Sequence, residues 1–264
     1  MKTRLTILVC ALCAAFPSLT HAQATESELE RDFGGRVSVE LDKKLSKGLH
    51  VNLSGQARFQ DNFSSFSRYY AGLGVTYKFN SWLKAGAGYN FIENKKSSGE
   101  WGVRHRAFAD LTGTVKGGDW TFSLKERLQL THRDVTNPWQ DNPNALVLRS
   151  RLKAEYGGFG SLTPYAYTEL RLALNDPLCI ATWNGASYSD YQFGGYSDCY
   201  LNRVRGVVGL EYEFDKRNSL DLYLIGDYTY DKNIDVNKEG TKLKSLTYDR
   251  AFNVNIGVGY KFSF

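Results

Sequence analysis

The sequence predicts an all-β fold, a transmembrane antiparallel β-barrel, and three observations support this prediction. Apolar and polar residues alternate along most of the chain, which gives each strand one apolar face. The alternating stretches are joined by connections that are short and long in turn, a rhythm typical of outer-membrane barrels. The composition also favours strands, because 17 Tyr, 15 Phe and 5 Trp stand against one Met and five Pro.

The first 24 residues have the features of a cleaved signal peptide. The positively charged start "MKTR" leads into the apolar run "LTILVCALCAAF", and the small residues of "AQA" follow at 22–24. We expect cleavage after Ala22 or Ala24, because the apolar run is too short to span a membrane as a helix. No later apolar run approaches the roughly 18 residues of a membrane helix. Residues 25–264 are therefore predicted to form a single outer-membrane β-barrel domain, exported by a Gram-negative bacterium.

Alternating stretches recur through the mature chain. In "LHVNLSGQARF", for example, Leu49, Val51 and Leu53 lie on one face, and His50 and Asn52 lie on the other. The predicted strands occupy 35–45, 49–59, 69–79, 82–93, 102–115, 119–132, 145–156, 162–174, 200–214, 218–230 and 247–264. Most exceed the roughly five or six residues usual in soluble sheets and are long enough to cross a bilayer at a tilt.

The connections alternate in length. The short ones are 43–48, 80–81, 116–118, 157–161 and 215–217. The long ones are 61–68, 94–101, 134–144, 175–199 and 231–246. In outer-membrane barrels the short turns are periplasmic and the long loops are extracellular. Aromatic residues beside the short turns are expected to form an interfacial girdle, namely Tyr77, Phe79, Trp82, Trp120, Tyr156, Tyr212, Phe214, Tyr260 and Phe262.

The chain end "VNIGVGYKFSF" alternates to its last residue. A closed sheet explains this pattern, because the last strand then pairs with the first and has no free edge. Eleven stretches conflict with the even strand number of bacterial single-chain barrels. We therefore predict twelve strands, with 25–33 as a short extra strand that turns at Gly34–Gly35 or as an ordered segment in the lumen. Ten strands is the alternative, if the first hairpin lies outside the wall.

The face opposite the apolar set is expected to line the lumen, and between residues 104 and 205 it is basic. Its positive residues are Arg104, Arg106, Lys125, Arg127, Arg133, Arg149, Arg151, Lys153, Arg171, Arg203 and Arg205. The same faces carry fewer acids, namely Asp110, Glu155, Glu169, Glu211 and Glu213. Inward positions elsewhere are glycines that leave room for a solute, namely Gly72, Gly74, Gly86, Gly88, Gly257 and Gly259.

Rows of arginine attract carboxylate, sulfate and phosphate groups by charge and by bidentate hydrogen bonds. The sequence therefore predicts a narrow, anion-preferring channel for small acidic solutes or oligosaccharides. The alternative is a plugged structural or interaction barrel without transport, because small barrels also fill their interiors with Arg–Glu networks.

Three further residues suggest specific features. Cys179 and Cys199 lie in the longest loop, and an isolated cysteine pair in an exported protein predicts one disulfide. Glu126 falls in the lipid-facing set, where a carboxylate is costly. A β-bulge that re-aims the side chain explains it, and a subunit contact or a lipid-headgroup site are the alternatives.

An outer-membrane hydrolase is a third hypothesis for function. His132 and Asp134 lie at an extracellular strand end, where a dyad is plausible, and His105 lies near the lipid headgroups. The sequence has no spacing typical of a Ser-His-acid triad, and no metal-ligand cluster, phosphate loop or dinucleotide fingerprint. We therefore expect no enzymatic activity, no metal and no cofactor. The net charge of +5 is too mild to predict nucleic-acid binding.

Two resemblances to known proteins follow from these segments. "VSVELDKKLSKGLHVNLSGQARF", "WLKAGAGYNF", "LRSRLKAEY" with "LTPYAYTEL", and "NSLDLYLIGDY" resemble the outer-membrane proteins of domain-of-unknown-function family 2490. This resemblance implies a barrel in the outer membrane and no particular activity, and the loop with the two cysteines looks like an addition to it. "LRSRLK" and "LNRVRG" are similar to the basic ladders of monomeric porins for acidic oligosaccharides, as in oligogalacturonate uptake.

The expected partners are outer-membrane lipid, small anionic solutes and the barrel-assembly machinery. The chain end resembles the terminal signal that this machinery reads, because Tyr260, Phe262 and Phe264 stand at the fifth-last, third-last and last positions. We expect the barrel to be a monomer.

Overall fold

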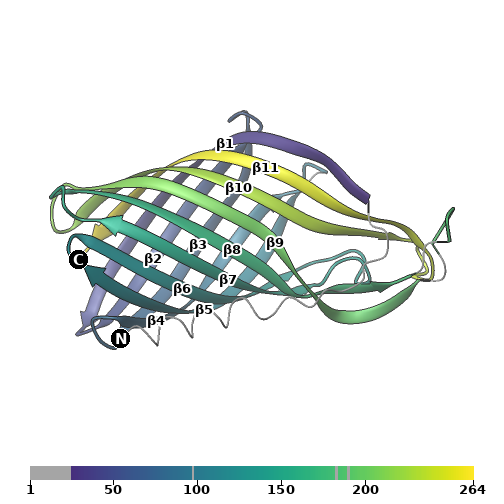
Figure 1. Cartoon of the computed structure of the whole chain (residues 1–264), viewed down its shortest axis with the longest axis horizontal. Helices are drawn as coiled ribbons and strands as arrows, with labels where there is room; N and C mark the ends of the chain where they lie inside the picture. The colour runs from purple at the N-terminus through teal and green to yellow at the C-terminus, as the bar shows by residue number, and fades with distance from the viewer. Residues whose placement is uncertain (1–24, 97, 182–183, 189–190) are drawn as a thin grey trace.

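A computed structural model describes residues 25–264 except 97, 182–183 and 189–190. The described residues form eleven strands in one closed barrel, in the spatial order β1-β11-β10-β9-β8-β7-β6-β5-β4-β3-β2 (Figure 1). The strands are β1 (Thr25–Ser46), β2 (Leu49–Gln60), β3 (Ser65–Lys78), β4 (Leu83–Lys95), β5 (Trp101–Gly117), β6 (Trp120–Arg133), β7 (Asn144–Tyr156), β8 (Leu162–Ile180), β9 (Gln192–Glu213), β10 (Asn218–Val236) and β11 (Leu243–Ser263). Within the described ranges, no helix is long and apolar enough to cross a membrane. The predicted signal peptide lies outside them.

The barrel class is as predicted, but the strand counts of twelve and ten are both wrong. Each of the eleven alternating stretches is one strand, and 25–33 is the first part of β1. It is neither a separate strand nor a segment inside the lumen, because it pairs with β11. The pair β1–β11 is parallel, with Val37 opposite Val258, whereas all other neighbouring pairs are antiparallel. One parallel pair lets an odd number of strands close without a free edge.

Gly34 and Gly35 make a close approach and not the predicted turn. A Cβ atom on Gly34 would collide with the carbonyl oxygen of Phe59 on β2. A Cβ atom on Gly35 would collide with the ring of Phe63, which also meets Phe33 edge-to-face at 5.2 Å. The two glycines therefore let the loop after β2 pack onto β1 at the point where the pairing between β1 and β2 ends.

The outer wall of the barrel is apolar. Leu53, Leu73, Leu111 and Val208 are each at least half exposed, as lipid-facing residues of a membrane barrel are. The aromatic girdle predicted beside the short turns is present, and Tyr77, Phe79, Trp82, Trp120, Tyr156, Tyr212, Phe214, Tyr260 and Phe262 neighbour those turns.

A second aromatic group lies at the other end of the barrel, where the longer loops are. The ring centroids of Tyr69 and Trp101 lie 5.6 Å apart there, and the Phe66 ring contacts both rings. On β3, Tyr69 is eight residues from Tyr77 of the girdle, about 26 Å along the strand. With a tilt of about 40°, this spacing gives a band roughly 20 Å tall, close to the ~25 Å of known barrels.

Strands β8 to β11 continue beyond the second aromatic group, so most of the predicted loops 175–199 and 231–246 is strand (Figure 1). The β8–β9 and β10–β11 hairpins bury apolar side chains against each other. This small core comprises Tyr191, Ile234, Val236, Leu243 and Leu246, with Cys179 packed beside it. Alternation therefore persists past the membrane because these hairpins also have one apolar face to bury.

The predicted disulfide is wrong, because both cysteines are free. Cys179 pairs with Phe193 across the β8–β9 hairpin, whereas the neighbour of Cys199, Asp198, pairs with Asp176. The two cysteines are thus offset by about four residues, roughly 13 Å along the strands, which exceeds the Cα separation that a disulfide spans. Burial raises the pKa of the Cys179 thiol to about 11, which keeps it protonated at neutral pH.

The predicted glycine wall does not leave open space. The Tyr223 ring lies over Gly257, and the Phe108 ring lies over Gly88. The glycines at 72 and 74 are covered by Asn90 and Asn52 side chains. Each of these inward glycines therefore leaves room for a larger side chain from a neighbouring strand, an arrangement that we call seating.

Gly257 tests this seating. We expect Gly257→Ala to lower the free energy of unfolding by about 1–3 kcal/mol, because the new methyl group displaces the Tyr223 ring. Urea titration of the refolded barrel in lipid vesicles measures the change. Gly206→Ala is the matched control, since a Cβ atom there meets nothing within 4 Å. Equal stability of the two variants would contradict the seating.

Glu126 points outward, so the expected β-bulge is wrong. Pairing is unbroken on both sides of Glu126, with Leu111 on β5 and Ser150 on β7. The Ser150 hydroxyl donates a hydrogen bond of 2.6 Å to the Glu126 carboxylate. Glu126 lies six residues from Trp120 of the girdle, about 20 Å along the strand, and therefore within the apolar band between the two aromatic groups. Its second carboxylate oxygen is buried without a partner among the described residues.

We expect Glu126→Leu to raise the free energy of unfolding by about 1–2 kcal/mol, because it removes a lipid-facing carboxyl group from the apolar band of the wall. The measurement is urea unfolding in vesicles, with sedimentation in detergent as a check of oligomeric state. Loss of stability, or dissociation of an oligomer, would instead indicate that the carboxylate contacts another subunit.

Candidate functional site

All eleven predicted basic residues lie on the inward face. Arg104, Arg106, Arg133, Arg149, Arg171, Arg203 and Arg205 line a large cavity in the lumen. Lys125, Arg127 and Arg151 line a smaller cavity together with Arg149. Lys153 lies toward the short turns, where it contacts Glu155 at 2.7 Å.

A row of alternating charge crosses four strands of the wall. Arg151 on β7 is opposite Glu169 on β8, Glu169 is opposite Arg205 on β9, and Arg205 is opposite Asp227 on β10. Facing residues on antiparallel strands have Cβ atoms about 4.5–5.5 Å apart. The strand register alone therefore brings these opposite charges together.

A second row, two residues nearer the long loops, carries like charges. Arg127, Arg149, Arg171 and Arg203 stand directly opposite one another on β6 to β9. We call these four residues the arginine row. Like charges in facing positions destabilise a sheet, so each guanidinium needs a counter-charge from elsewhere.

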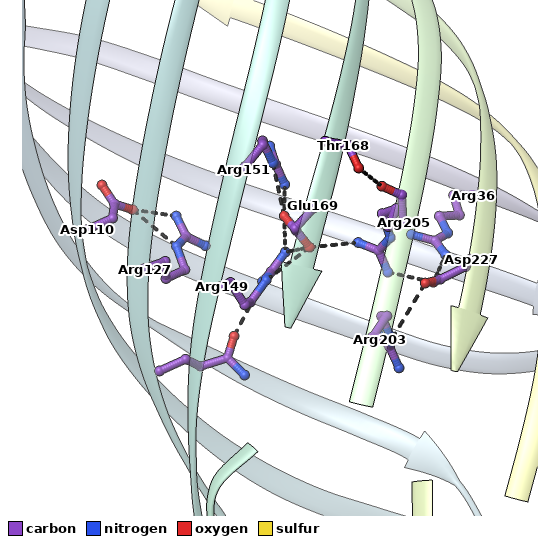
Figure 2. Close-up of polar contacts among 11 residues, drawn as sticks. Arg36, Asp110, Arg127, Arg149, Arg151, Thr168, Glu169, Arg203, Arg205 and Asp227 are labelled. Carbon is purple, nitrogen blue, oxygen red and sulfur yellow. Dashed lines mark hydrogen bonds and ion pairs between the residues drawn. The ribbon is translucent and has the colours of Figure 1, made fainter. Parts of the chain in front are cut away.

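Two buried carboxylates supply part of that counter-charge (Figure 2). Glu169 contacts Arg149 at 2.7 Å, Arg151 at 2.7 Å and Arg205 at 3.5 Å. Asp227 is also held by three arginines, with Arg205 at 2.6 Å. The other two are Arg203 at 3.5 Å and Arg36 at 3.6 Å. Arg205 joins the two groups, and we call these seven residues the ion-pair belt.

Some of the basic residues that lie nearer the short turns contact aromatic rings. The guanidinium of Arg127 lies 3.9 Å from the centre of the Phe108 ring, and that of Arg151 lies 4.3 Å from the Tyr167 ring. Arg127 also donates to Asp110, with Nη2 at 2.5 Å from the carboxylate. Cation–π contacts of this kind fix the direction of a long side chain.

The large cavity has a volume of about 390 Å³ and lies on the long-loop side of the belt. Ten basic side chains line it against three acidic ones. Each of the three acids already has a partner. Asp141 contacts Arg133 at 2.8 Å, Asp176 contacts Lys232 at 3.2 Å, and Asp231 accepts a hydrogen bond from Asn202.

Five arginines of this cavity have no carboxylate within 4.0 Å among the described residues, namely Arg58, Arg68, Arg104, Arg106 and Arg171. We call them the arginine cluster. Three of them bond only to neutral groups. Arg58 donates to Gln56 at 2.7 Å, Arg68 to Asn94 at 2.6 Å, and Arg106 to Thr131 at 3.2 Å.

The smaller cavity, about 50 Å³, lies on the other side of the belt. Arg149 lines both cavities, so they meet at this side chain. Because Arg149 is bound to Glu169, a solute that moves between the cavities must pass an ion pair.

Four residues of the site were absent from the sequence prediction, namely Arg36, Arg58, Arg68 and Asp227. Arg68 lies on β3, which carries two glycines of the predicted glycine wall, and Arg36 and Arg58 lie on β1 and β2, outside the strands interpreted as basic. Their signal was present, since Arg58 and Arg68 alternate with lipid-facing residues as the predicted set does. Extending the inward set to every strand would have found them.

The histidines do not form the dyad considered above. His132 Nδ1 lies 2.9 Å from the Asn144 side-chain oxygen, and no contact joins it to Asp134 in the described structure. His105 Nδ1 lies 2.5 Å from the Tyr89 hydroxyl on the outer wall. Across the described ranges, no group of three His, Cys, Asp or Glu residues is placed to hold a metal ion.

Comparisons with known proteins add the family. The model of a family described as "Protein of unknown function (DUF2490)" matches residues 37–238. The chain belongs to this family. No curated protein matches. Among solved structures, the outer-membrane expressed OmpT of Vibrio cholerae is similar, with 13% identity and a TM-score of 0.35. The similarity covers 81% of this chain and 64% of that one, so the chain spans less than two thirds of that protein's length.

Membership of the DUF2490 family confirms the resemblance of the strand segments. The matched range runs from within β1 to just past the end of β10. It therefore includes most residues of the ion-pair belt and the whole arginine cluster.

The ion-pair belt makes a stability prediction. We expect Glu169→Gln to lower the free energy of unfolding by about 3 kcal/mol, because it removes the charge of the buried carboxylate that Arg149, Arg151 and Arg205 share. Glu155→Gln is the control, since Glu155 has one partner and is 27% exposed, and it should cost at most about 1 kcal/mol. Urea titration in vesicles compares the two. Equal costs would show that the belt does not stabilise the barrel.

Proposed function

We propose that this protein is an outer-membrane β-barrel whose lumen passes small anionic solutes. Its apolar outer wall and closed hydrogen-bonded sheet support the location, because a bilayer demands both. Short turns at one end and longer connections at the other support an orientation with the short turns in the periplasm. The closed sheet has no unpaired wall edge, which supports a monomer.

The terminal strand supports the barrel-assembly machinery as a partner. The Phe264 amide donates to the Asp42 carbonyl at 2.9 Å, and the Phe264 carbonyl accepts from Lys44 at 3.1 Å. The chain is therefore held in the wall up to its last residue. Tyr260, Phe262 and Phe264 alternate along this held strand, with the spacing of the terminal signal that the chain end resembles.

The arginine cluster, which shares Arg171 with the arginine row, is the observation that carries the anion preference. Arg127, Arg149 and Arg203 of the row are paired with Asp110, Glu169 and Asp227, whereas the five cluster arginines have no carboxylate within 4.0 Å among the described residues. The cavity that they line has far more basic than acidic side chains. Rings of positive side chains select anions by attracting them and repelling cations. A volume of about 390 Å³ suits small acidic solutes, including the end of an acidic oligosaccharide.

The second candidate is a barrel that does not conduct. The ion-pair belt favours it, because Glu169 and Asp227 tie side chains from five strands together at the junction of the two cavities. A network of this kind keeps the lumen closed if its ion pairs do not exchange. Such a barrel would act through what binds at its long-loop end.

Conductance in a planar bilayer tests the proposal. We expect the refolded mature protein to conduct steadily under a KCl gradient, with a reversal potential that shows anion preference. The double variant Arg104→Gln/Arg171→Gln should move this potential toward zero, because neither arginine has a carboxylate within 4.0 Å in the described ranges. These two residues are sharper targets than Arg149, Arg151 and Arg205, whose replacement would also free Glu169.

The control for the double variant is Arg217→Gln, which changes an exposed arginine in the turn between β9 and β10 and should keep the selectivity. A silent bilayer, with the protein shown to be folded by its gel migration without heating, would support the closed barrel. Unchanged selectivity in the double variant would mean that the cavity does not select the ion.

A further inference from the structure

We propose that the arginine cluster is a binding site for a compact multivalent oxyanion, a small molecule with two or more carboxylate or phosphate groups. The inference deepens the proposed function, and it rests on that function because the ligand is the solute that the lumen admits. Three observations support the inference. Like charges face each other, hydrogen-bond donors are unused, and one carboxylate elsewhere in this barrel binds three arginines.

At two different parts of the wall, one arginine stands directly opposite another. Arg58 on β2 is directly opposite Arg68 on β3, and Arg171 on β8 is directly opposite Arg203 on β9. Repulsion also acts across the lumen, because Arg68, Arg104, Arg171 and Arg203 line the same cavity. Asp141 and Asp231 line it too and offset only part of this charge. The cluster is therefore one positive enclosure, and not several separate patches.

The donors of this enclosure are largely unused. Arg104 and Arg171 make no hydrogen bond to any residue that the structure describes, although each guanidinium has five N–H donors. Arg58 uses only its Nε, which donates to Gln56. Donors directed into a cavity are satisfied by water or by an acceptor that enters, and an anionic acceptor also removes the repulsion.

The belt shows how many arginines one carboxylate holds here. Glu169 is bound by three arginines, and so is Asp227. In the belt, two carboxylates are thus bound by five arginines, because both bind Arg205. At this ratio, the five arginines of the cluster accommodate about two anionic groups. A single acetate or chloride ion would leave most of the cluster without a counter-charge.

The size and lining of the cavity limit the ligand further. Its volume, about 390 Å³, falls at the lower end of small-molecule sites, which are roughly 300–1,000 Å³. Few apolar side chains line it, among them Val147 and Ala173. The site therefore suits a small polar polyanion more than the acyl chains of a lipid.

Isothermal titration of the refolded mature protein in detergent tests the site, with citrate, pyrophosphate and acetate as probes at equal ionic strength. We expect citrate or pyrophosphate to bind with one molecule per barrel, and acetate to bind at least tenfold more weakly. Arg171→Gln and Arg68→Gln should each weaken binding by about tenfold, which is the effect of losing roughly one charge-assisted hydrogen bond. Both variants are expected to fold, because each removes repulsion.

Arg217→Gln is the control, with the same change of charge outside the cavity, and it should bind as the parent does. The site is refuted if citrate and pyrophosphate bind no better than acetate, or if all three variants weaken binding equally. Tight binding by a barrel that is silent in the bilayer would refute transport and keep the site. Anion-selective conductance without preference for multivalent probes would keep transport and refute the site.

Discussion

Closure of the sheet is the constraint on which the rest of this structure depends. Inside a bilayer every backbone N–H and C=O group must find a partner within the protein, because hydrocarbon offers none. The parallel pair β1–β11 meets this demand with eleven strands. Once the sheet is closed, the period of two divides its residues into one set that faces lipid and one that faces the lumen. The apolar wall and the arginine-rich interior are therefore two consequences of one alternation.

Closure also explains which predictions from sequence succeeded. The strands were found because alternation is a local property that each segment carries by itself. The inward position of the eleven basic residues followed from the same pattern. Strand parity was different, because an even number is a regularity among known barrels and not a physical requirement. A parallel closing pair satisfies the backbone equally well, and nothing within the segment 25–33 reveals that its partner is β11.

Pairings between strands were beyond local reasoning. Whether Glu169 neutralises Arg149, Arg151 or Arg205 depends on the register of three strands, and a shift of one residue would send its side chain to the other face. The same holds for Cys179 and Cys199, which stand in one loop of the sequence but are offset across a hairpin. Glycines were misinterpreted for a related reason, since the ring that covers Gly257 comes from Tyr223 on the neighbouring strand.

The contrast between the belt and the arginine cluster is the strongest guide to function. Paired charges such as those of Glu169 and Asp227 are what a barrel needs if its interior only has to be filled. The chain makes such pairs where the lumen is tight, so its fold is able to neutralise buried arginines. A few residues nearer the long loops it instead places arginine opposite arginine, and among the described residues no carboxylate lies within 4.0 Å of the cluster. Because uncompensated like charges lower stability, their presence beside a cavity is the physical reason for proposing a counter-charge from outside the chain.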